Sequence, residues 1–433
     1  MGYKPLGECV ERIIDHRGLT PKKLGGSWSE SGYRALSAKN IKNGLLVQED
    51  AMNLVSEEMY RQWMPEEVKR GDVFITSEAP FGEVLYWDSD EKLVLSQRVF
   101  GLTAKTGVCN SRYLYYWMRS PQFQGELRGR ATGTTVIGLR QPELLKCQVN
   151  LPPLEQQTAI ACLLGAIDGK ISLNNQINGY LGTLCESIAA KACSKPDGAL
   201  SDICIQVTDK TSFDSTDIET YVSTESLLQN KGGRQTASSL PAAGKVTCYR
   251  RGDTLVSNIR PYFKKIWFAS NDGTCSGDVL VFRANEVSNA AYLYSCLRQD
   301  SFFDHVMRGA KGTKMPRGDK KQVMNFPIAF RCDESDLAVL NSVVEQMAMN
   351  DAKSARLAEL CDALLPKLMS GEIDVSKVDL TQLNSHLSDH SVAIREINNS
   401  TIAETTFINR FIALRMLFEK LSHGIRHAFD ILG

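Results

Sequence analysis

Two long segments of the chain place apolar residues at alternating spacings of three and four positions, the pattern of a helix that packs along one seam. The seam within residues 154–193 consists of Ile160, Leu164, Ile167, Ile171, Ile177, Leu181, Leu184, Ile188 and Ala192. The seam that follows residue 331 consists of Leu337, Leu340, Val344, Met347, Leu357, Cys361, Leu365 and Leu368. A continuous helix over residues 154–193 would extend about 60 Å at about 1.5 Å per residue, too far to pack inside one small domain. We therefore predict an antiparallel pair of long helices that acts as a rigid spacer, in preference to ordinary packing of each helix in a domain core.

Polar residues interrupt both seams at corresponding positions. Asn174-Asn175 interrupts the first seam and Asn350-Asp351 interrupts the second. Polar residues at seam positions commonly fix the register and the partner of a helix, at some cost in stability. The interruption is therefore predicted to be part of a repeated unit.

The segments that precede the two seams also repeat each other. Gly71-Asp72 in VKRGDVFIT matches Gly252-Asp253 in CYRRGDTLVS. Further pairs follow in the same order, which are NSRYLY with NAAYLY, RATGTT with GAKGTK, and VNLPP with MNFPI. Each half contains short runs typical of strands, at residues 73–76, 94–95, 254–257 and 279–283. The sequence thus predicts an internal duplication, in which an α+β domain followed by a long helix occurs twice along the chain.

The duplication sets the predicted division of the chain, and a turn-forming cluster at Lys195-Pro196-Asp197-Gly198 separates the halves. The predicted parts are a globular domain at residues 1–153, a long helix at 154–195, a second globular domain at 196–330, a second long helix at 331–375, and a polar linker with an amphipathic helix at 376–433.

Composition describes an ordinary globular protein with no overall charge. The chain has 433 residues, of which 43% are hydrophobic and 23% are charged, and its 50 basic residues balance 50 acidic ones. Any attraction to a polyanion must therefore be local. The 12 cysteines include no CxxC pair, which argues against a zinc site and favours a reducing, cytoplasmic compartment. No apolar run approaches the roughly 18 residues of a membrane span.

Basic, glycine-rich segments occur at matching positions in the two halves. RGAKGTKMPRGDKK, residues 308–321, contains six basic residues and one acid, and RGRATGTTVIGLR, residues 128–140, contains three basic residues and no acid. Glycine lets a backbone approach phosphates closely, and each neutralised phosphate releases condensed counterions. A solvated basic loop is the ordinary interpretation of such a run. Its recurrence in a neutral protein favours a phosphate-binding role.

A second candidate surface follows each Gly-Asp pair, where SNIRPYFKK at residues 257–265 corresponds to TSEAPFGE at residues 76–83. Polar side chains here could contact base edges, with Glu78 accepting from cytosine N4 and Arg260 donating to guanine O6 and N7. The two halves would then read different sequences. A purely structural role for Pro80 and Pro261 in shaping a turn is an equal alternative. The candidate DNA-contacting residues are Ser77, Glu78, Arg128, Arg130, Thr132, Thr134, Thr135, Arg140, Asn258, Arg260, Tyr262, Lys264, Lys265, Arg308, Lys311, Thr313, Lys314, Arg317 and Lys320.

Motifs for catalysis are missing from the sequence. It contains neither the Asn-Pro-Pro-Tyr/Phe signature of adenine methyltransferases nor a GxxxxGK[ST] phosphate loop. The E-x-K triplet at residues 67–69 has no upstream Pro-Asp anchor of a nuclease. The pairs His386/His390 and His423/His427 have helical metal-ligand spacing but no ligand cluster beside them. We expect no catalytic residue, no bound metal and no cofactor in this chain.

The sequence resembles the specificity subunit of type I restriction-modification enzymes over residues 1 to about 378. The resemblance lies in the duplication, in LPPLEQQ at residues 151–157, where the family has Leu-Pro-Pro-Leu-x-Glu-Gln, and in LLPKLMSGEIDV at residues 364–375. The second helix entry, Phe326-Pro327-Ile328, lacks the Glu-Gln.

The resemblance implies a non-catalytic subunit with two target-recognition domains that read a bipartite double-stranded DNA target, and helices that set the spacer. Two methyltransferase subunits that bind S-adenosylmethionine, and motor-nuclease subunits that use ATP and Mg²⁺, would be the partners. The specificity subunit would hold DNA in register while a partner flips an adenine out of the stack. A specificity subunit of a type II system, a scaffold without a DNA role, and a stand-alone nuclease or methyltransferase are the alternatives.

The last segment departs from the family pattern. After Asp379 a further seam is formed by Phe407, Phe411, Leu414, Phe418, Leu421, Ile425, Phe429 and Leu432. We expect this apolar face to be covered by the central helices, by a partner subunit or by a second copy in a homodimer.

Overall fold

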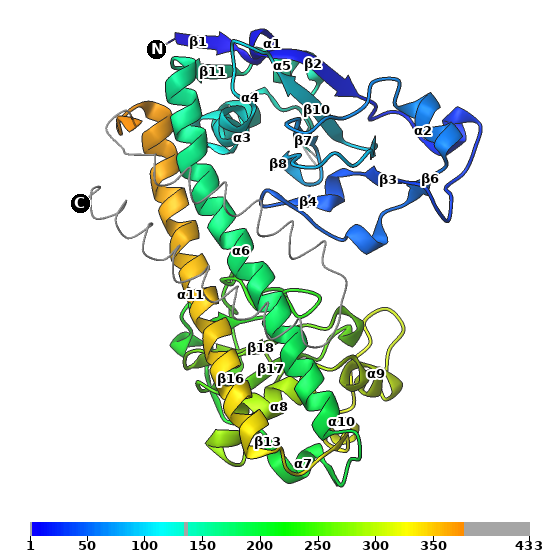
Figure 1. The fold of residues 1–433 in the computed structure, drawn as a ribbon, viewed down its shortest axis with the longest axis vertical. Coiled ribbons are helices and arrows are strands. Elements are labelled where there is room, and N and C mark those ends of the chain that lie inside the picture. Colours follow the sequence, from blue (N-terminus) through cyan, green and yellow to red (C-terminus); the bar gives the residue numbers. More distant parts are fainter. Residues whose placement is uncertain (1, 134–136, 376–433) are drawn as a thin grey trace. The chain divides into compact units, whose positions relative to one another are not determined.

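The computed structural model describes residues 2–133 and 137–375, which form helices and sheets of an α+β fold (Figure 1). The chain divides into two compact units. Unit 1 comprises Met1–Lys170 with the described residues from Leu357 on, and unit 2 comprises Ile171–Arg356. The division falls within the two long helices, α6 (Leu154–Ala192) and α11 (Glu334–Ser370), so each unit contains part of both. Where the chain is described, none of its helices is both long and apolar enough to cross a membrane.

Unit 1 is built around a four-stranded antiparallel sheet in the order β2-β10-β7-β8. A second sheet, β6-β3-β9, includes a parallel pair, and β1 pairs with β11 at the start of α6. The elements that precede α6 are β1 (Gly2–Pro5), α1 (Leu6–Cys9), β2 (Val10–Asp15), β3 (Tyr33–Leu36), β4 (Ile41–Lys42), β5 (Leu45–Leu46), β6 (Leu54–Val55), α2 (Glu57–Trp63), β7 (Val73–Ser77), β8 (Phe81–Tyr86), β9 (Val94–Leu95), β10 (Val99–Ala104), α3 (Ser111–Arg119), α4 (Pro121–Arg130), α5 (Gln141–Lys146) and β11 (Gln148–Leu151).

Unit 2 repeats the main sheet and the terminal strand pair of unit 1, whereas its second sheet has four strands, in the order β14-β16-β19-β15, instead of three. Its main sheet has the antiparallel order β13-β20-β17-β18, its second sheet contains the parallel pair β15-β19, and β12 pairs with β21. The elements between α6 and α11 are β12 (Gly198–Ala199), α7 (Leu200–Ile203), β13 (Cys204–Gln206), β14 (Lys210–Ser212), β15 (Tyr221–Val222), β16 (Lys245–Tyr249), β17 (Thr254–Ser257), β18 (Ile266–Phe268), β19 (Gly273–Cys275), β20 (Val279–Ala284), α8 (Ala290–Leu297), α9 (Asp300–Arg308), α10 (Lys320–Met324) and β21 (Pro327–Ile328). The predicted duplication of an α+β domain is confirmed.

The repeated Gly-Asp pair stabilises the start of the central strand in each sheet. Asp72 is buried, accepts a hydrogen bond from the Lys69 backbone N–H at 2.9 Å and pairs with Arg12 at 3.2 Å. Asp253 is equally buried, and both of its oxygens accept from the Arg283 guanidinium, at 2.8 and 2.7 Å. A buried carboxylate is stable only when charged and polar partners compensate it, so the motif serves the fold rather than DNA contact.

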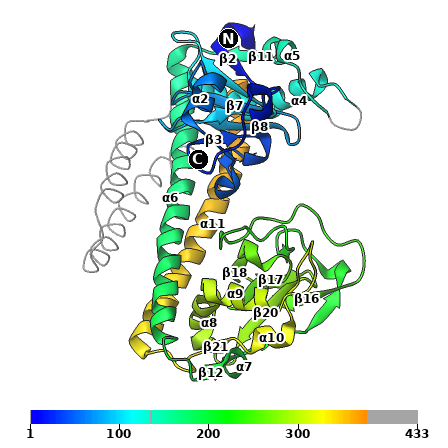
Figure 2. The same ribbon diagram turned by 90° about the vertical axis from the view of Figure 1, so that its right-hand side faces the viewer.

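Within unit 2 the two long helices run antiparallel (Figure 2), and polar contacts join them there. Asn174 Nδ2 donates to Ser354 Oγ at 3.0 Å, and Asn350 Nδ2 donates to Asn178 Oδ1 at 2.8 Å. Asn178 in turn donates to Asp351 Oδ1 at 2.6 Å. Of the predicted polar interruptions, Asn174 and Asn350 are fully buried, whereas their neighbours Asn175 and Asp351 are exposed.

The predicted seam of α6 is partly wrong on both sides of the interruption, since Ile171 before it is only half-buried while Leu173 is buried. Ile160, Leu164 and Ile167 are buried, as are Ile177 and Leu181. Farther along, Cys185 and Ala189 are the buried residues, while the expected Leu184, Ile188 and Ala192 are only half-buried. The reason is that this part of α6 buries a second face, since Cys185 lies against Ser295 of α8. The expected seam of residues 407–432 lies outside the described residues.

Asn174→Leu is expected to stabilise unit 2 by about 1 kcal/mol. The buried Oδ1 of Asn174 accepts no hydrogen bond from any group in the described part of the chain. Removing this unsatisfied buried atom should stabilise the fold by more than the loss of the one neutral hydrogen bond donated by Asn174 destabilises it. Urea unfolding of the full chain, followed by hydrogen exchange in α6 and α11, measures the change. Asn175→Leu is the control, because this exposed neighbour should change stability little; a less stable Asn174→Leu protein would contradict the prediction.

Candidate nucleic-acid interface

In unit 1 the two candidate DNA surfaces lie against each other. The loop that joins β7 to β8 contains Glu78, and the backbone N–H of Leu139 donates to the carbonyl oxygen of the preceding Ser77 at 3.1 Å. The glycine-rich segment closes on itself through paired backbone hydrogen bonds between Thr132 and Gly138, at 2.9 and 2.8 Å. Arg17 supports the junction, because its Nη1 donates to the Leu139 carbonyl at 2.9 Å while its guanidinium stacks on Phe100.

Unit 2 forms the corresponding junction. Here the backbone N–H of Arg260 donates to the Pro316 carbonyl at 2.8 Å, and Asn258 Nδ2 donates to the Gly318 carbonyl at 3.3 Å. The basic segment closes through Lys311 and Arg317, which exchange two backbone hydrogen bonds at 2.9 and 3.0 Å. Segments more than fifty residues apart in sequence thus form one continuous surface in each unit.

The tip of each β-hairpin loop has a residue with positive φ before a proline, although the peptide bond is cis only at Ala79-Pro80. Ala79 has φ +42° and Arg260 has φ +49°, and each precedes a proline. The left-handed region costs a non-glycine residue about 1–3 kcal/mol, so it persists only where the surrounding contacts impose it. The structural role considered for Pro80 and Pro261 is therefore compatible with a reading role for the side chains on the same loop.

The predicted contact residues differ in accessibility. Exposed side chains are those of Arg128, Thr132, Arg140, Tyr262, Arg308, Lys311, Thr313, Lys314, Arg317 and Lys320. Half-buried side chains are those of Glu78, Arg130, Arg260, Lys264 and Lys265. Ser77 and Asn258 are buried, so in this conformation their side chains cannot contact a base edge. Thr134 and Thr135 lie outside the described residues.

Several of the predicted cations are already paired with protein groups. Arg317 is held by both oxygens of Asp278, at 2.9 and 3.1 Å, and this hydrogen bonding raises the Arg317 pKa. Arg130 pairs with Glu126 at 2.9 Å, and Lys265 Nζ donates to the Thr224 carbonyl at 2.5 Å. Within residues 2–133 and 137–375, no ion pair is found for Arg128, Arg140, Arg308, Lys314 and Lys320. These five exposed cations are the ones best placed to neutralise phosphates.

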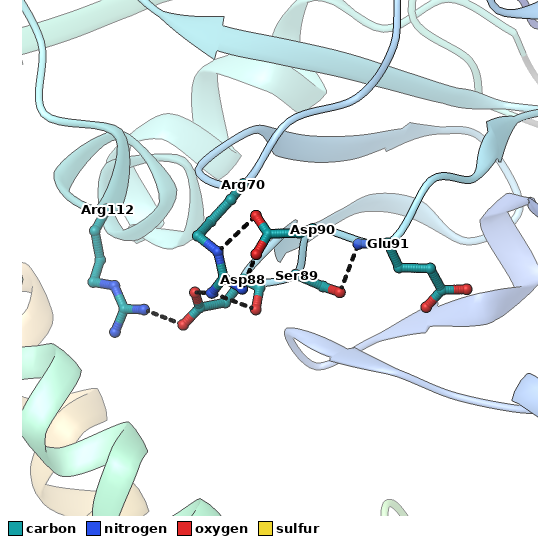
Figure 3. A network of polar contacts seen from close by, with 6 residues as sticks. All are labelled: Arg70, Asp88, Ser89, Asp90, Glu91 and Arg112. Atoms are coloured by element: carbon teal, nitrogen blue, oxygen red, sulfur yellow. Dashed lines mark hydrogen bonds and ion pairs between the residues drawn. The ribbon is translucent and has the colours of Figure 1, made fainter. Parts of the chain in front are cut away.

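An acidic loop in unit 1 pairs with two further arginines (Figure 3). Arg70 lies between Asp88, at 2.6 Å, and Asp90, at 2.9 Å, and Arg112 of α3 reaches the same Asp88 at 3.0 Å. The Arg112 guanidinium also stacks over the Tyr86 ring. The charges of Arg70 and Arg112 are therefore compensated within the fold.

A charged turn contacts the candidate hairpin loop in each unit, and the sequence comparison of the halves missed it. In unit 1 the carbonyl of Arg98 accepts from the Ser77 backbone N–H at 2.8 Å, and the Arg98 side chain pairs with Glu78 at 3.1 Å. In unit 2 the Asp278 carbonyl accepts from the Asn258 backbone N–H at the same 2.8 Å distance. The charge at this turn is therefore positive in one half and negative in the other. The signal was available, because both residues precede the strands β10 and β20 that the repeat aligns.

In the described part of the chain, no group of three or more histidine, cysteine or acidic side chains is placed to hold a metal ion. The histidine pairs beyond residue 380 lie outside the described residues.

Comparison with known proteins finds one protein family for the first part of the chain. Residues 5–181 match the family described as the type I restriction modification DNA specificity domain. The chain is 28% identical over 152 residues to the type I restriction enzyme MjaVIII specificity subunit of Methanocaldococcus jannaschii, a match that covers 34% of this chain and 36% of that protein. It is 24% identical over 129 residues to the EcoDI specificity subunit of Escherichia coli, covering 28% of this chain and 29% of that protein. The chain thus spans about a third of the length of these curated relatives.

Two solved structures are similar over most of the chain. The type I restriction-modification S subunit from M. genitalium has a TM-score of 0.46 and 14% identity, and 85% of this chain and 95% of that one are covered. The HsdS subunit from Thermoanaerobacter tengcongensis has a TM-score of 0.34 and 16% identity, with 86% and 97% covered.

Proposed function

We propose that this chain, which carries a type I restriction modification DNA specificity domain over residues 5–181, is the DNA-specificity subunit of a type I restriction-modification complex. It would recognise a bipartite target, with the surface of unit 1 reading one half and that of unit 2 reading the other. The chain itself would be non-catalytic.

One observation carries the proposal. In each unit the hairpin loop that follows the Gly-Asp strand is hydrogen-bonded to the basic, glycine-rich segment, through Leu139 and Ser77 in one and through Arg260 and Pro316 in the other. Such a surface combines cations for phosphate contact, which fixes register, with polar and charged groups for base readout, which gives specificity. The side chains differ between the units, with Glu78 and Arg98 on one surface and Arg260 and Asp278 on the other. Two unlike half-sites follow from this difference.

The partners in this proposal are methyltransferase and motor-nuclease subunits. S-adenosylmethionine, ATP and Mg²⁺ would bind to them, and adenine methylation would require that one of them flip the base. Three apolar side chains of the long helices in unit 2, Tyr180, Val339 and Met349, are 39–46% exposed and would be available for contacts with these partners.

The test is to identify the target and then measure binding. Methylome sequencing of the host should reveal a bipartite methylated motif that disappears when this gene is deleted. The purified chain, with its methyltransferase partner, should then bind a duplex carrying the motif more tightly than one with either half scrambled, and binding should weaken as salt rises. A chain that binds no duplex, with or without the partner, would instead favour a scaffold function.

A further inference from the structure

A chain of charged side chains in unit 2 connects the long helix α6 to the loop between β17 and β18, residues 258–265, which we call the reading loop. Lys231 Nζ lies 2.9 Å from Glu186 of α6 and 2.9 Å from Asp300, the first residue of α9. Asp300 also contacts Lys264 of the reading loop at 3.0 Å. We call Glu186, Lys231, Asp300 and Lys264 the charge relay. Its two ends are a spacer helix and a loop predicted to contact DNA.

The backbone reinforces the relay at its centre. Lys231 has φ +60° and the preceding Asn230 has φ +54°, both in the left-handed region that costs a non-glycine residue free energy. Their N–H groups donate to the carbonyls of Phe263 and Lys264, at 2.9 and 2.8 Å. The strained segment is therefore hydrogen-bonded directly to the reading loop, and its lysine side chain points back to α6.

Burial gives the inner part of the relay a fixed geometry. The Lys231 side chain is only 12% exposed, and the neighbouring Arg298 is 6% exposed and also pairs with Glu186, at 3.3 Å. The Arg298 guanidinium packs against α6 at Gly182, so closely that a Cβ atom on residue 182 would lie 2.3 Å from this guanidinium. Charges so enclosed must stay paired, since an unpaired buried charge is costly. Asp300 is 60% exposed, and the two lysines that donate to it lower its pKa.

Unit 1 repeats only the contact between α6 and the domain helix, since Arg119 pairs with Asp168 of α6 as Arg298 pairs with Glu186 of α6 in unit 2. Asp168 of α6 accepts from Tyr116 at 2.7 Å and lies 3.8 Å from Arg119, and both of these residues belong to α3. In the described part of unit 1, no ion pair links α6 to the loop that contains Glu78. The relay is therefore particular to unit 2.

We propose that the charge relay is a positioning device that sets where the unit 2 reading loop lies relative to the spacer helix, and so determines discrimination at one half of the target. The proposal rests on the proposed function. If the loop is displaced from the position in which it contacts the bases, its hydrogen bonds to base edges weaken sharply, because such bonds tolerate little displacement.

Asp300→Asn tests the relay at Asp300, which is 60% exposed, so the substitution should leave the fold intact. We expect discrimination at the half-site read by unit 2 to fall about fivefold, the upper end for an ion pair of this exposure. The measurement is the ratio of Kd values, in the complex with the methyltransferase, for the natural duplex and duplexes substituted in one half only. Discrimination at the other half should be unchanged.

Asp304→Asn is the matched control, because this exposed aspartate lies one turn later on α9 and no ion pair is found for it in the part of the chain described. Lys231→Met should reduce discrimination at the same half by about tenfold or more, and Lys231→Arg, which retains the charge, should restore most of it. Equal behaviour of Asp300→Asn and Asp304→Asn, or loss at both halves, would overturn the relay. A wild-type chain that discriminates at neither half would overturn the proposed function instead.

Discussion

Replacing Arg308, Lys314 and Lys320 together by glutamine is expected to weaken DNA binding about a hundredfold near physiological salt. Each phosphate contact contributes about 0.9 to the slope of log K against log salt, so three lost contacts remove close to 3 from that slope. The three side chains are exposed, and no ion pair within residues 2–133 and 137–375 holds them away from a phosphate. Fluorescence anisotropy over a salt series measures both quantities.

The control for this prediction carries the same charge change elsewhere in unit 2. Lys210, Lys245 and Arg251 are exposed and lie on β14, on β16 and in the turn before β17, outside both loops of the reading surface. Their combined replacement by glutamine should leave the salt slope nearly unchanged. If both triple variants lost affinity equally, attraction would depend on net charge alone, and the assigned phosphate-binding segment would be wrong. Sequence preference should survive in the first variant, because phosphate contacts position DNA without reading it.

Asp253→Ala is expected to destabilise unit 2 by about 3 kcal/mol. The substitution removes both acceptors of the Arg283 guanidinium and the acceptor of the Arg250 backbone N–H. Breaking a buried pair on one side leaves an uncompensated charge, a larger cost than the pair contributes when intact. The Arg283 side chain is 24% exposed, so partial hydration places the expected cost at the lower end of the usual range.

Hydrogen exchange under increasing urea can measure this loss, because it resolves the two units of a chain whose unfolding need not be two-state. Protection of β17 and β20 should fall while that of β7 and β10 stays constant. Asp304→Ala, an exposed aspartate in the same unit, should change neither. Unchanged protection of β17 in Asp253→Ala would mean that the Gly-Asp pair does not support the sheet, and its recurrence would then need another explanation.

The architecture was predictable because duplication supplied an internal comparison. Strands expected at residues 73–76, 94–95 and 254–257 occur as β7, β9 and β17, and α6 begins at Leu154 as the pattern indicated. The inward-facing residues of α6 beyond Asn174 were harder to predict. A periodicity analysis assumes one buried face, whereas Cys185 is buried against a domain helix and not only along the helix pair.

The candidate site was only partly predictable for a different reason. Residue type identified the basic segment and the hairpin loop, but hydrogen bonds between them, such as Leu139 to Ser77, depend on long-range folding that no local pattern encodes. The turn at Arg98 and Asp278 was missed because these corresponding residues carry opposite charges, and the two halves were aligned by the similarity of their residues. Residue type also gave no indication that the side chains of Ser77 and Asn258 are buried. The proposed base contacts stay predictions.

In both units the first strand pairs with the last, β1 with β11 and β12 with β21. The polypeptide therefore enters and leaves each globular part at neighbouring points beside a long helix. A globular part whose first and last strands pair can be replaced as a whole. Another domain with the same two flanking strands would fit in its place without a change in the long helices. If each unit reads one half of the target, as proposed, such an exchange would change one half of the recognition sequence and retain the other.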